Sequence, residues 1–566
     1  MNRLANLKFG ITEVVIITGI LAFAAVIYLV NLNQIQLNID EVSPGYNAYS
    51  LLQTGKDEFG KKFPISFRFG GTYSPPLYIY LTVPMIAFFG LNIAAVRMVS
   101  ALSAIGSVLV LYFILKNLKI LESKFVLYFG LLVFTITPWL VIYGRSGYEA
   151  ALPFLFFEIA TLLTWIGLKK PKYLMIAIIV WSLSIYSSYT NKILAPLSIL
   201  GIMVFFRDIV FHNSYRKFLL IGVILALAIQ IPNLFLIFTK SFIVKSSISF
   251  SENILYQYSQ SNFLLPGFIV LPYLYVREFF SQYLTYFSLR SLFWDGDPLL
   301  FRSIPGLSVF YSWLSIPYLV GLFQLCKNYS KLNYKFILFI TIVSPIPAAF
   351  TKDPFWTYRA IPLLLPMIII IIIGINKLIS FRIPFLKSLC LVLFCISAIY
   401  LWQGFFVLLP YERAKDWQYG YSQLVKEITS RPNEFFVINN SSNGSTYLEL
   451  AFFLKLDPRV LQNSVDQSIK DDYYNRLDFN PNYSFLNIRT GNVPWHDTHK
   501  KLVLVGDELS FSDNQIREHF LEKVFEIRYP SGNIAFVGYR THPDRKCITD
   551  WQRTKLIIEE CTQYIK

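Results

Sequence analysis

Long apolar runs alternate with short polar segments through roughly the first 410 residues of the chain. About 20 consecutive apolar residues span a bilayer as a helix, and shorter runs fit a thin or crowded bundle. The pattern predicts an all-α polytopic membrane bundle of about 11 to 13 transmembrane helices over residues 1–410. The eleven candidate runs are residues 11–30, 93–115, 125–143, 148–168, 173–190, 193–206, 218–238, 307–326, 335–350, 360–376 and 388–409.

Two further apolar stretches interrupt the long polar segments. Residues 77–89 are too few for a full crossing and indicate an interfacial or re-entrant helix. We therefore expect residues 31–92 to form one outer loop with a juxtamembrane helix. Residues 239–305 are expected to form a second outer loop, in which the stretch 263–287 either lies in the interface or supplies two more crossings.

The pattern changes near residue 410, where charged residues mix with clusters of Asn, Asp, Ser and Gly. Short apolar segments at 434–438, 502–505 and 535–538 predict strands, and 445–455 and 513–524 predict helices. The turn at 530–533 suggests a terminal hairpin. Residues 411–566 are thus predicted to form a soluble α/β domain on the outer face.

Composition agrees with a membrane protein, because 54% of the 566 residues are hydrophobic and only 15% are charged. A net charge of +16 would suggest nucleic acid as a partner of a soluble chain. Here the basic residues gather in alternate short loops, near 116–124, 169–172, 207–217, 327–335 and 377–387. With Arg3 and Lys8 they predict a cytoplasmic N-terminus, an extracytoplasmic C-terminal domain and a multi-pass protein of the cell membrane, in contact with lipids and not with nucleic acid.

Five cysteines are too few for a disulfide framework. Cys326, Cys390 and Cys395 lie in or beside the membrane helices and are expected to be packing residues. Cys547 and Cys561 both belong to the outer domain, so one disulfide is open to them.

Charged residues near membrane depth are costly, and those that persist tend to be functional or paired. The predicted topology brings a mixed set of acids and cations to the outer ends of the helices. Ordinary interfacial caps are the alternative interpretation for any one of them. The set is Asp40, Glu41, Arg97, Arg145, Glu149, Lys192, Lys240, Lys245, Asp353 and Arg359.

The outer loops contain an ordered series of short motifs. The first loop contributes Asp40-Glu41, Gly55, Pro75-Pro76-Leu77, Phe89-Gly90 and Ala95-Val96-Arg97. Later segments contribute Pro138-Trp139, Arg145 to Glu149, Gly296-Asp297 with Arg302, and Pro345 to Thr351 with Arg359. Their order and spacing resemble the glycosyltransferase C superfamily, and above all its aminoarabinose lipid A transferases and protein O-mannosyltransferases. The resemblance covers about residues 10–410.

The resemblance implies transfer of a sugar from a polyprenyl-phosphate carrier to an acceptor at the outer face. It also implies that Asp40 is the catalytic acid/base and that Glu149 is a second acid. Tyr73-Ser74 departs from the lipid A branch, which has an acidic and a basic residue there, so the metal ligand of that branch has no counterpart.

The chemistry of the reaction leads to similar assignments. A phosphate leaving group needs fixed cations, for which Arg145, Lys192 and Arg359 are the candidates. The attacking hydroxyl needs a carboxylate as general base. Supporting roles are assigned to Glu41, Arg97, Tyr186, Asp297, Arg302 and Asp353.

Metal involvement stays undecided, with Mg or Mn held by carboxylates as the form it would take. Asp295-Gly296-Asp297 matches a short metal signature of nucleotide-sugar transferases, but an acidic turn or a supporting element of the outer site fits better. His496 and His499 do not suggest a closed zinc site.

Two other functions compete with sugar transfer. A transporter or flippase of lipid-linked glycans would show repeat symmetry and charges near the midplane, which the sequence lacks in most spans. A polymerase or ligase of surface glycans would share the outer-face chemistry. The sugar stays open, as does the acceptor, which is a lipid, a protein or a glycan.

Overall fold

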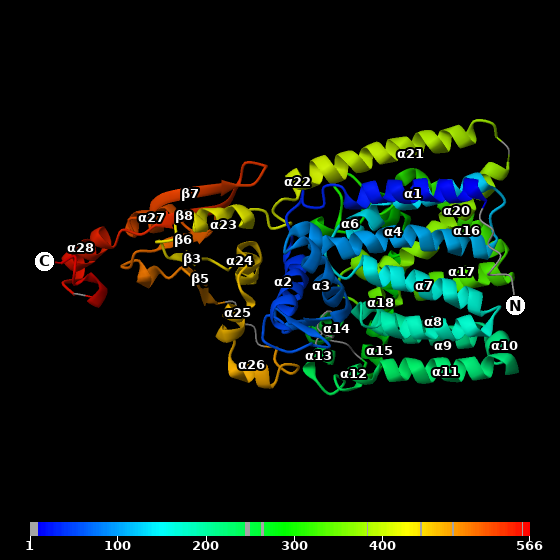
Figure 1. The fold of residues 1–566 in the computed structure, drawn as a ribbon, viewed down its shortest axis with the longest axis horizontal. Helices are drawn as coiled ribbons and strands as arrows, with labels where there is room; N and C mark the ends of the chain where they lie inside the picture. The colour runs from blue at the N-terminus through cyan, green and yellow to red at the C-terminus, as the bar shows by residue number, and fades with distance from the viewer. Residues whose placement is uncertain are drawn as a thin grey trace. The chain divides into compact units, whose positions relative to one another are not determined.

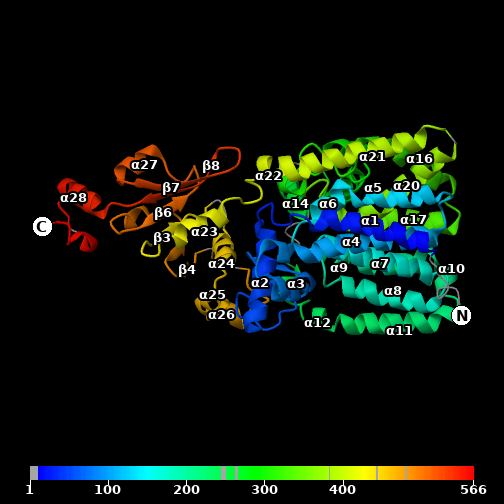
Figure 2. The ribbon, with the colours of Figure 1, turned by 45° about the horizontal axis from the view of Figure 1, so that its top comes forward.

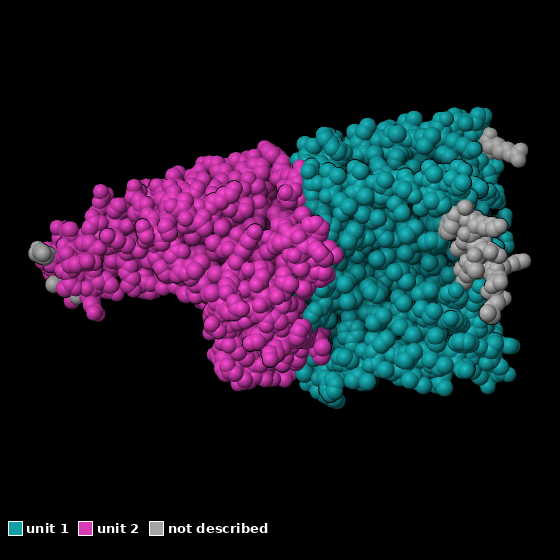
Figure 3. Space-filling view, viewed as in Figure 1, with its two compact units in different colours: residues 1–32, 74–81, 97–407 teal, residues 33–73, 82–96, 408–566 magenta. Residues whose placement is uncertain are grey.

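The computed structural model describes residues 10–243, 250–261, 265–381, 383–441, 444–477, 480, 482–556 and 558–565. Arg3, Lys8 and Lys245 lie outside the described residues, as do positions 263 and 264 of the second outer loop. The chain divides into two compact units, coloured separately in Figure 3. Unit 1 comprises Met1–Leu32, Ser74–Leu81 and Arg97–Val407, and unit 2 comprises Asn33–Tyr73, Thr82–Val96 and Leu408–Lys566. The sequence did not suggest that residues 33–73 group with the C-terminal segment.

Unit 1 is helical, and each of the eleven apolar runs contains at least one helix. In both ribbon views α4, α7, α8 and α11 lie side by side (Figures 1 and 2). The longer helices are α1 Ile11–Leu29, α4 Ile93–Leu118, α5 Lys124–Thr135, α7 Ala151–Gly167, α8 Pro171–Ser184, α9 Tyr189–Phe205, α11 Asn213–Ile229, α14 Ser251–Gln260, α15 Gly267–Thr285, α16 Ser315–Lys327, α17 Leu332–Val343, α20 Leu364–Ser380 and α21 Leu386–Trp402. Short helical segments between them are α6 Pro138–Gly144, α10 Arg207–Val210, α12 Ile231–Leu234, α13 Lys240–Ile243, η2 Ser291–Asp295, η3 Leu300–Arg302, η4 Ser312–Leu314, α18 Ile346–Ala349, α19 Thr357–Ala360, η5 Ile361–Leu363 and η6 Gln403–Leu408.

Fewer helices reach membrane length than there are apolar runs. In the described part of the chain five helices are long and apolar enough to cross a membrane, and a sixth is added if the bent pair α5 and α6 forms one span. Helices such as α8, with 14 residues, are only about 21 Å long at 1.5 Å per residue. Helix length and composition thus indicate a multi-pass membrane protein. These two criteria alone do not account for all of the 11 to 13 expected crossings.

The two ambiguous stretches both form helices. Residues 77–89 lie in α3, Pro76–Phe89, as the sequence predicts for a helix in the first loop. Within 263–287 the described residues form one helix, α15, which contains Pro272, Arg277 and Glu278 and does not meet the hydropathy criterion for a span. Whether this outer loop supplies additional crossings stays a prediction.

Helix α20 is apolar on all sides and buried from Leu364 to Ile375. Met367 and the six isoleucines that follow it are buried, as expected for a helix surrounded by other helices. A Cβ atom on Gly374 would lie 1.8 Å from the carbonyl oxygen of Pro317 at the start of α16. The glycine therefore permits the close approach of these two backbones.

Unit 2 contains a six-stranded mixed sheet of order β4-β5-β3-β6-β8-β7. Its central strand β3 runs parallel to β5 and β6, and both edges end in antiparallel pairs. The elements are α2 Ile39–Thr54, β1 Phe67–Phe69, β2 Thr72–Ser74, α22 Leu409–Glu412, α23 Tyr421–Thr429, β3 Phe436–Ile438, α24 Thr446–Leu454, α25 Pro458–Ser464, α26 Gln467–Asp471, β4 Ser484–Phe485, β5 Ile488–Thr490, η7 Trp495–Asp497, β6 Val503–Gly506, α27 Asp513–Glu518, β7 Glu522–Arg528, β8 Ile534–Arg540, α28 Pro543–Thr554 and η8 Glu559–Cys561.

The sheet confirms the three strands that the sequence predicts, and also the terminal hairpin, formed by β7 and β8. The helix predicted over 513–524 ends at Glu518, so that prediction is wrong beyond this point. The chain continues instead into β7, where Phe525 and Ile527 are buried and the residues next to them are less so. Burial of every second residue is typical of a strand with one face exposed, not of a helix.

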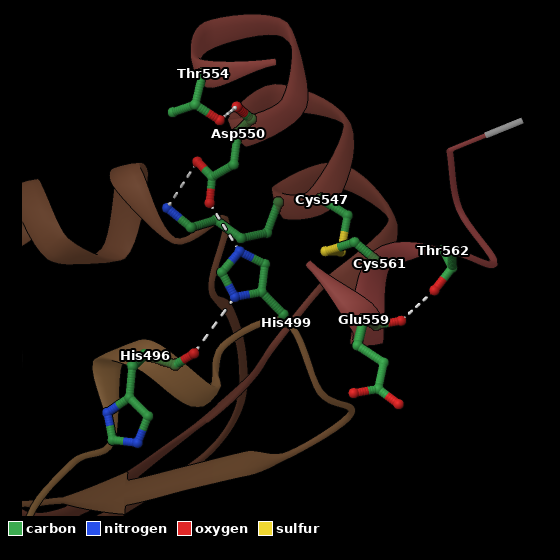
Figure 4. The surroundings of a disulfide bond; sticks show 9 residues. His496, His499, Cys547, Asp550, Thr554, Glu559, Cys561 and Thr562 are labelled. Atoms are coloured by element: carbon green, nitrogen blue, oxygen red, sulfur yellow. Dashed lines mark hydrogen bonds and ion pairs between the residues drawn. A yellow bond between two sulfur atoms is a disulfide. The ribbon is translucent and has the colours of Figure 1, made fainter. Parts of the chain in front are cut away.

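Cys547 and Cys561 form a disulfide that links α28 to the last described residues (Figure 4). The same view shows His499, whose Nε2 lies 2.8 Å from Oδ2 of Asp550. Cys326, Cys390 and Cys395 are free. The disulfide left open by the sequence is confirmed.

Candidate active site

Asp40 and Glu41, adjacent in sequence, have different environments at the start of α2. Asn38 is the N-cap, and its Oδ1 accepts a hydrogen bond from the backbone N–H of Glu41 at 3.2 Å. Glu41 returns the bond, because its Oε2 accepts from the N–H of Asn38 at 3.1 Å. This capping box satisfies two helix-end donors. Glu41 is fully buried, whereas Asp40 is exposed.

A second buried acid lies close to Glu41 within unit 2. Glu449 on α24 is fully buried, and neither of its carboxyl oxygens has a hydrogen-bond partner among the described residues. Burial, reinforced by the charge of Glu41, raises the pKa of Glu449 well above its ordinary value. This shift favours the protonated form of Glu449 in the folded protein.

Asp57 and Glu58 form a buried acidic pair in the first loop. Glu58 accepts hydrogen bonds from Asn47 Nδ2 and from the Tyr447 hydroxyl, both at 3.0 Å. Asp57 accepts one from the Tyr473 hydroxyl at 2.5 Å. Burial raises the pKa of Asp57 to about 6 and that of Glu58 to about 8. The pair ties the first loop to the C-terminal segment of unit 2, and sequence reasoning missed it.

In unit 1, Arg302 and Arg359 form what we call the arginine pair. Both guanidinium groups stack on the indole of Trp356, at 4.4 and 4.6 Å from the ring centroid. Neither guanidinium has a hydrogen-bond or ion-pair partner within the described part of the chain, and Arg359 Nε is buried as well. Two unneutralised cations in a partly buried place are a ready site for an anion.

Glu149 and three tyrosines surround the arginine pair. The carboxylate of Glu149 is close enough to Arg359 to interact with it electrostatically. The rings of Tyr143, Tyr148 and Tyr358 pack against one another with centroids 5.4 to 6.1 Å apart. Buried Asp297 belongs to the same cluster, since it accepts hydrogen bonds from Thr357. The structure thus brings together Glu149, Asp297, Arg302 and Arg359 from the residues that the sequence singled out.

Arg97 and Arg145 have a different setting, at the C-terminal end of α1. Arg145 donates to the carbonyl oxygens of Ile27, Val30 and Asn31, the last two at 2.7 and 3.1 Å. Arg97 donates to the carbonyl oxygen of Leu32 at 2.7 Å. Cations at a helix C-terminus satisfy its unpaired carbonyl groups and its dipole. Binding of the lipid phosphate by Arg145 stays a prediction, but three hydrogen bonds to carbonyl oxygens already use most of its N–H groups.

Lys192, Tyr186 and Asp353 have other neighbours. Lys192 on α9 stacks on the rings of Tyr189 and Phe242, at 4.4 and 5.5 Å. Tyr186 donates its hydroxyl to the carbonyl of Ile229 at 2.6 Å, a contact that holds helix ends together. Half-buried Asp353 has no hydrogen-bond or ion-pair partner in the ranges that the structure describes.

No group of three or more His, Cys, Asp or Glu side chains that could hold a metal ion occurs among the described residues. Asp295 is exposed and forms an ion pair with Arg290 at 2.7 Å, whereas Asp297 is buried. The two acids of the short metal signature therefore face different environments.

Comparison with known proteins supports the fold. No protein-family model and no curated protein matches the chain. The structure is similar to ArnT from Cupriavidus metallidurans bound to undecaprenyl phosphate, with a TM-score of 0.55 at 12% identity, covering 94% of this chain and 98% of that one. A tethered acceptor-peptide complex of the Archaeoglobus fulgidus oligosaccharyltransferase also matches, with a TM-score of 0.48 at 11% identity over 94% of this chain and 74% of that one.

The similarity to the oligosaccharyltransferase, with a TM-score below 0.5, is too weak to support a conclusion. At 12% identity the similarity to ArnT shows the fold alone. The chain therefore has a membrane-protein fold like that of ArnT. Residue roles do not follow from it.

The buried acid pair predicts that unit 2 loses stability as pH rises. The pKa of Glu58 is about 8 in the folded protein against an ordinary 4.5, so the folded state binds more protons than the unfolded state between these values. Stability is then greatest below pH 4.5 and falls through pH 8, by an amount on the order of a few kcal/mol. Glu58→Gln should flatten this dependence, as measured by the thermal unfolding midpoint of the purified protein between pH 5 and pH 8.5.

The matched control is Glu508→Gln, which changes an exposed acid of the same unit and should keep the wild-type dependence on pH. An identical slope for Glu58→Gln and the wild type would contradict this assignment.

Proposed function

We propose that the chain is an integral membrane glycosyltransferase that moves a sugar from a polyprenyl-phosphate carrier to an acceptor hydroxyl or phosphate. The observation that carries the proposal is the arginine pair, two guanidinium groups that stack on Trp356 and form no direct ion pair with a carboxylate among the described residues. The fold adds support, because ArnT, which it resembles along 94% of the chain, was solved with undecaprenyl phosphate.

In the proposed reaction the acceptor oxygen attacks the anomeric carbon of the sugar. The bond from that carbon to the phosphate oxygen breaks, and polyprenyl phosphate leaves with the bonding electrons. Arg302 and Arg359 stabilise the negative charge that develops on the phosphate, for which the planar guanidinium fork is well suited. Glu149, which interacts with Arg359, contributes to the orientation of that arginine.

The proton of the attacking hydroxyl passes to a carboxylate. Asp40 is the residue that we assign to this step, because it is exposed at the second position of α2 while its neighbour Glu41 is committed to the cap. A base needs a carboxylate that can reach the acceptor hydroxyl. The proposal gives no step to a metal ion.

We place the reaction on the outer face of the cell membrane. Positive charge in the loops assigned to the cytoplasm supports this orientation. The disulfide between Cys547 and Cys561 supports it independently, because disulfides persist in oxidising compartments.

A transporter of lipid-linked glycans stays the second candidate because of one observation. Glu158 is fully buried in α7, beside the hydroxyl of Ser107, and ionisable residues within membrane helices often belong to transport paths. Purified protein with radiolabelled polyprenyl-phospho-sugars and membrane extracts separates the two. Label on an acceptor supports transfer, and label that only crosses vesicles supports transport.

Asp40→Asn should leave a folded protein with activity reduced roughly 100-fold or more, because the general base is lost. The measurement is the rate of label transfer to the acceptor in the assay above. Glu508→Gln, which changes an exposed acid of unit 2, is the control, and with it transfer should stay near the wild-type rate. Normal turnover by Asp40→Asn would remove it from the mechanism.

Arg359→Gln should weaken binding of the donor lipid by roughly 10- to 150-fold, the range expected for one lost hydrogen-bonded charge interaction of about 1.5 to 3 kcal/mol. The measurements are KM for the labelled donor and inhibition by free undecaprenyl phosphate. Arg290→Gln changes an exposed arginine of the same unit and should have little effect. Equal donor affinity in both variants would rule out phosphate binding by Arg359.

A further inference from the structure

We infer that Asp297 is a positioning residue, which fixes Arg302 and Arg359 relative to one another, and that it is not a metal ligand. The inference rests on the proposed function, in which the pair binds the phosphate of the donor lipid. It follows from the way one buried carboxylate joins the segment that carries Arg302 to the segment that carries Arg359.

The carboxylate of Asp297 makes three hydrogen bonds in two segments. Its Oδ2 accepts from the backbone N–H of Thr357 at 3.0 Å and from the Thr357 hydroxyl at 2.6 Å. Its Oδ1 accepts from the backbone N–H of Leu299 at 2.9 Å. Asp297 is 5% exposed, so these bonds are shielded from water and costly to break.

Thr357 anchors the segment that carries Arg359. Its hydroxyl is also hydrogen-bonded to that of Tyr143 at 2.6 Å. Its carbonyl oxygen accepts from the Trp139 indole N–H at 3.1 Å. Every polar atom of Thr357 thus has a partner, and the residue lies directly between Trp356 and the turn that carries Arg359.

The turn before Asp297 explains why this acid is buried and Asp295 is not. Gly296 has φ of +76°, a conformation that other residues rarely adopt. Its missing Cβ would lie 3.2 Å from Cα of Ser308. The backbone reverses at this glycine, which leaves Asp295 exposed with Arg290 and Asp297 inside.

Arg302 follows Asp297 by five residues, at the end of η3. Its charge interacts with the Asp297 carboxylate, but no ion pair joins them in the part of the chain that the structure describes. Both carboxylate oxygens are committed to N–H and O–H donors. The acid therefore stabilises the positions of the arginines without neutralising them.

The same commitments disfavour a metal at Asp297. Three of the roughly four lone-pair sites of the carboxylate already accept hydrogen bonds, and a divalent cation would need further ligands besides. The described residues offer no group of three acids, histidines or cysteines for this purpose. The second acid of the short signature, Asp295, is already paired with Arg290.

The test compares Asp297→Asn with Asp295→Asn in the purified full-length protein. Asparagine has one acceptor oxygen and one NH2 group, so it cannot accept from both Thr357 and Leu299. Hydrogen exchange of the amides at 356–363, followed by mass spectrometry, should become faster in Asp297→Asn and stay unchanged in Asp295→Asn. Affinity for undecaprenyl phosphate should fall roughly 10- to 100-fold in Asp297→Asn, as expected when buried donors lose their acceptor.

Thr357→Val and Thr357→Ser examine the same contact with a smaller change. Valine has the shape of threonine without its hydroxyl, and should reproduce part of both effects. Serine keeps the hydroxyl and should restore exchange and lipid affinity to near the wild-type values. This pair keeps the inference testable if Asp297→Asn does not fold.

Three outcomes would overturn the inference. Unchanged exchange at 356–363 in both Asp297→Asn and Thr357→Val would show that the carboxylate does not hold this segment. Loss of transfer in Asp297→Asn with normal exchange and lipid affinity would mean that Asp297 takes part in the chemistry directly. Mg²⁺ that tightens lipid binding to the wild type, but not to Asp297→Asn, would make Asp297 a metal ligand.

Failure of the proposed function has a different signature. The wild type would then bind no undecaprenyl phosphate and transfer no label, whereas the exchange comparison would still decide whether Asp297 fixes residues 356–359.

Discussion

Hydrocarbon offers no hydrogen bonds, and the polar groups of unit 1 are arranged accordingly. The centre of α20 is a run of buried isoleucines without a polar side chain. Where α1 ends, Arg97 and Arg145 donate to the carbonyl groups that the helix leaves unpaired. These two arginines thus lie at a helix end, where the backbone needs partners. The same places hold the residues with chemistry, since an exposed charge is tolerated only there.

This constraint also explains why the fold could be predicted from the sequence. Apolar runs mark helices in lipid because no other open structure satisfies the backbone, and each of the eleven runs contains a helix. The strands of unit 2 were found where apolar residues cluster between turns. β7 was missed in part because its first residues, Glu522 and Lys523, are charged and exposed, as is common at the edge of a sheet.

The candidate site could be predicted only as a set of residue types. Sequence alone does not distinguish Arg145 from Arg359, yet one caps α1 and the other stacks on Trp356. Glu58 gave no signal, because its partner Tyr447 is 389 residues away along the chain. Asn38 and Glu41 do carry a local signal, since a polar N-cap and an acid three residues later make a capping box. That motif separates Glu41 from Asp40 without a structure.

The arginine pair is where stability and function oppose each other. Cation–π contact with Trp356 offsets part of the cost of removing the guanidinium groups from water, but it supplies no hydrogen-bond acceptor, and the buried Nε of Arg359 has none among the described residues. A direct ion pair with Asp297 would lower that cost and would also cancel the positive charge. Because Asp297 is bonded to Thr357 and Leu299 instead, the charge remains available. An anion with several acceptor oxygens can then bind to both guanidinium groups and form the charge-assisted hydrogen bonds that the folded protein lacks. Phosphate is such an anion.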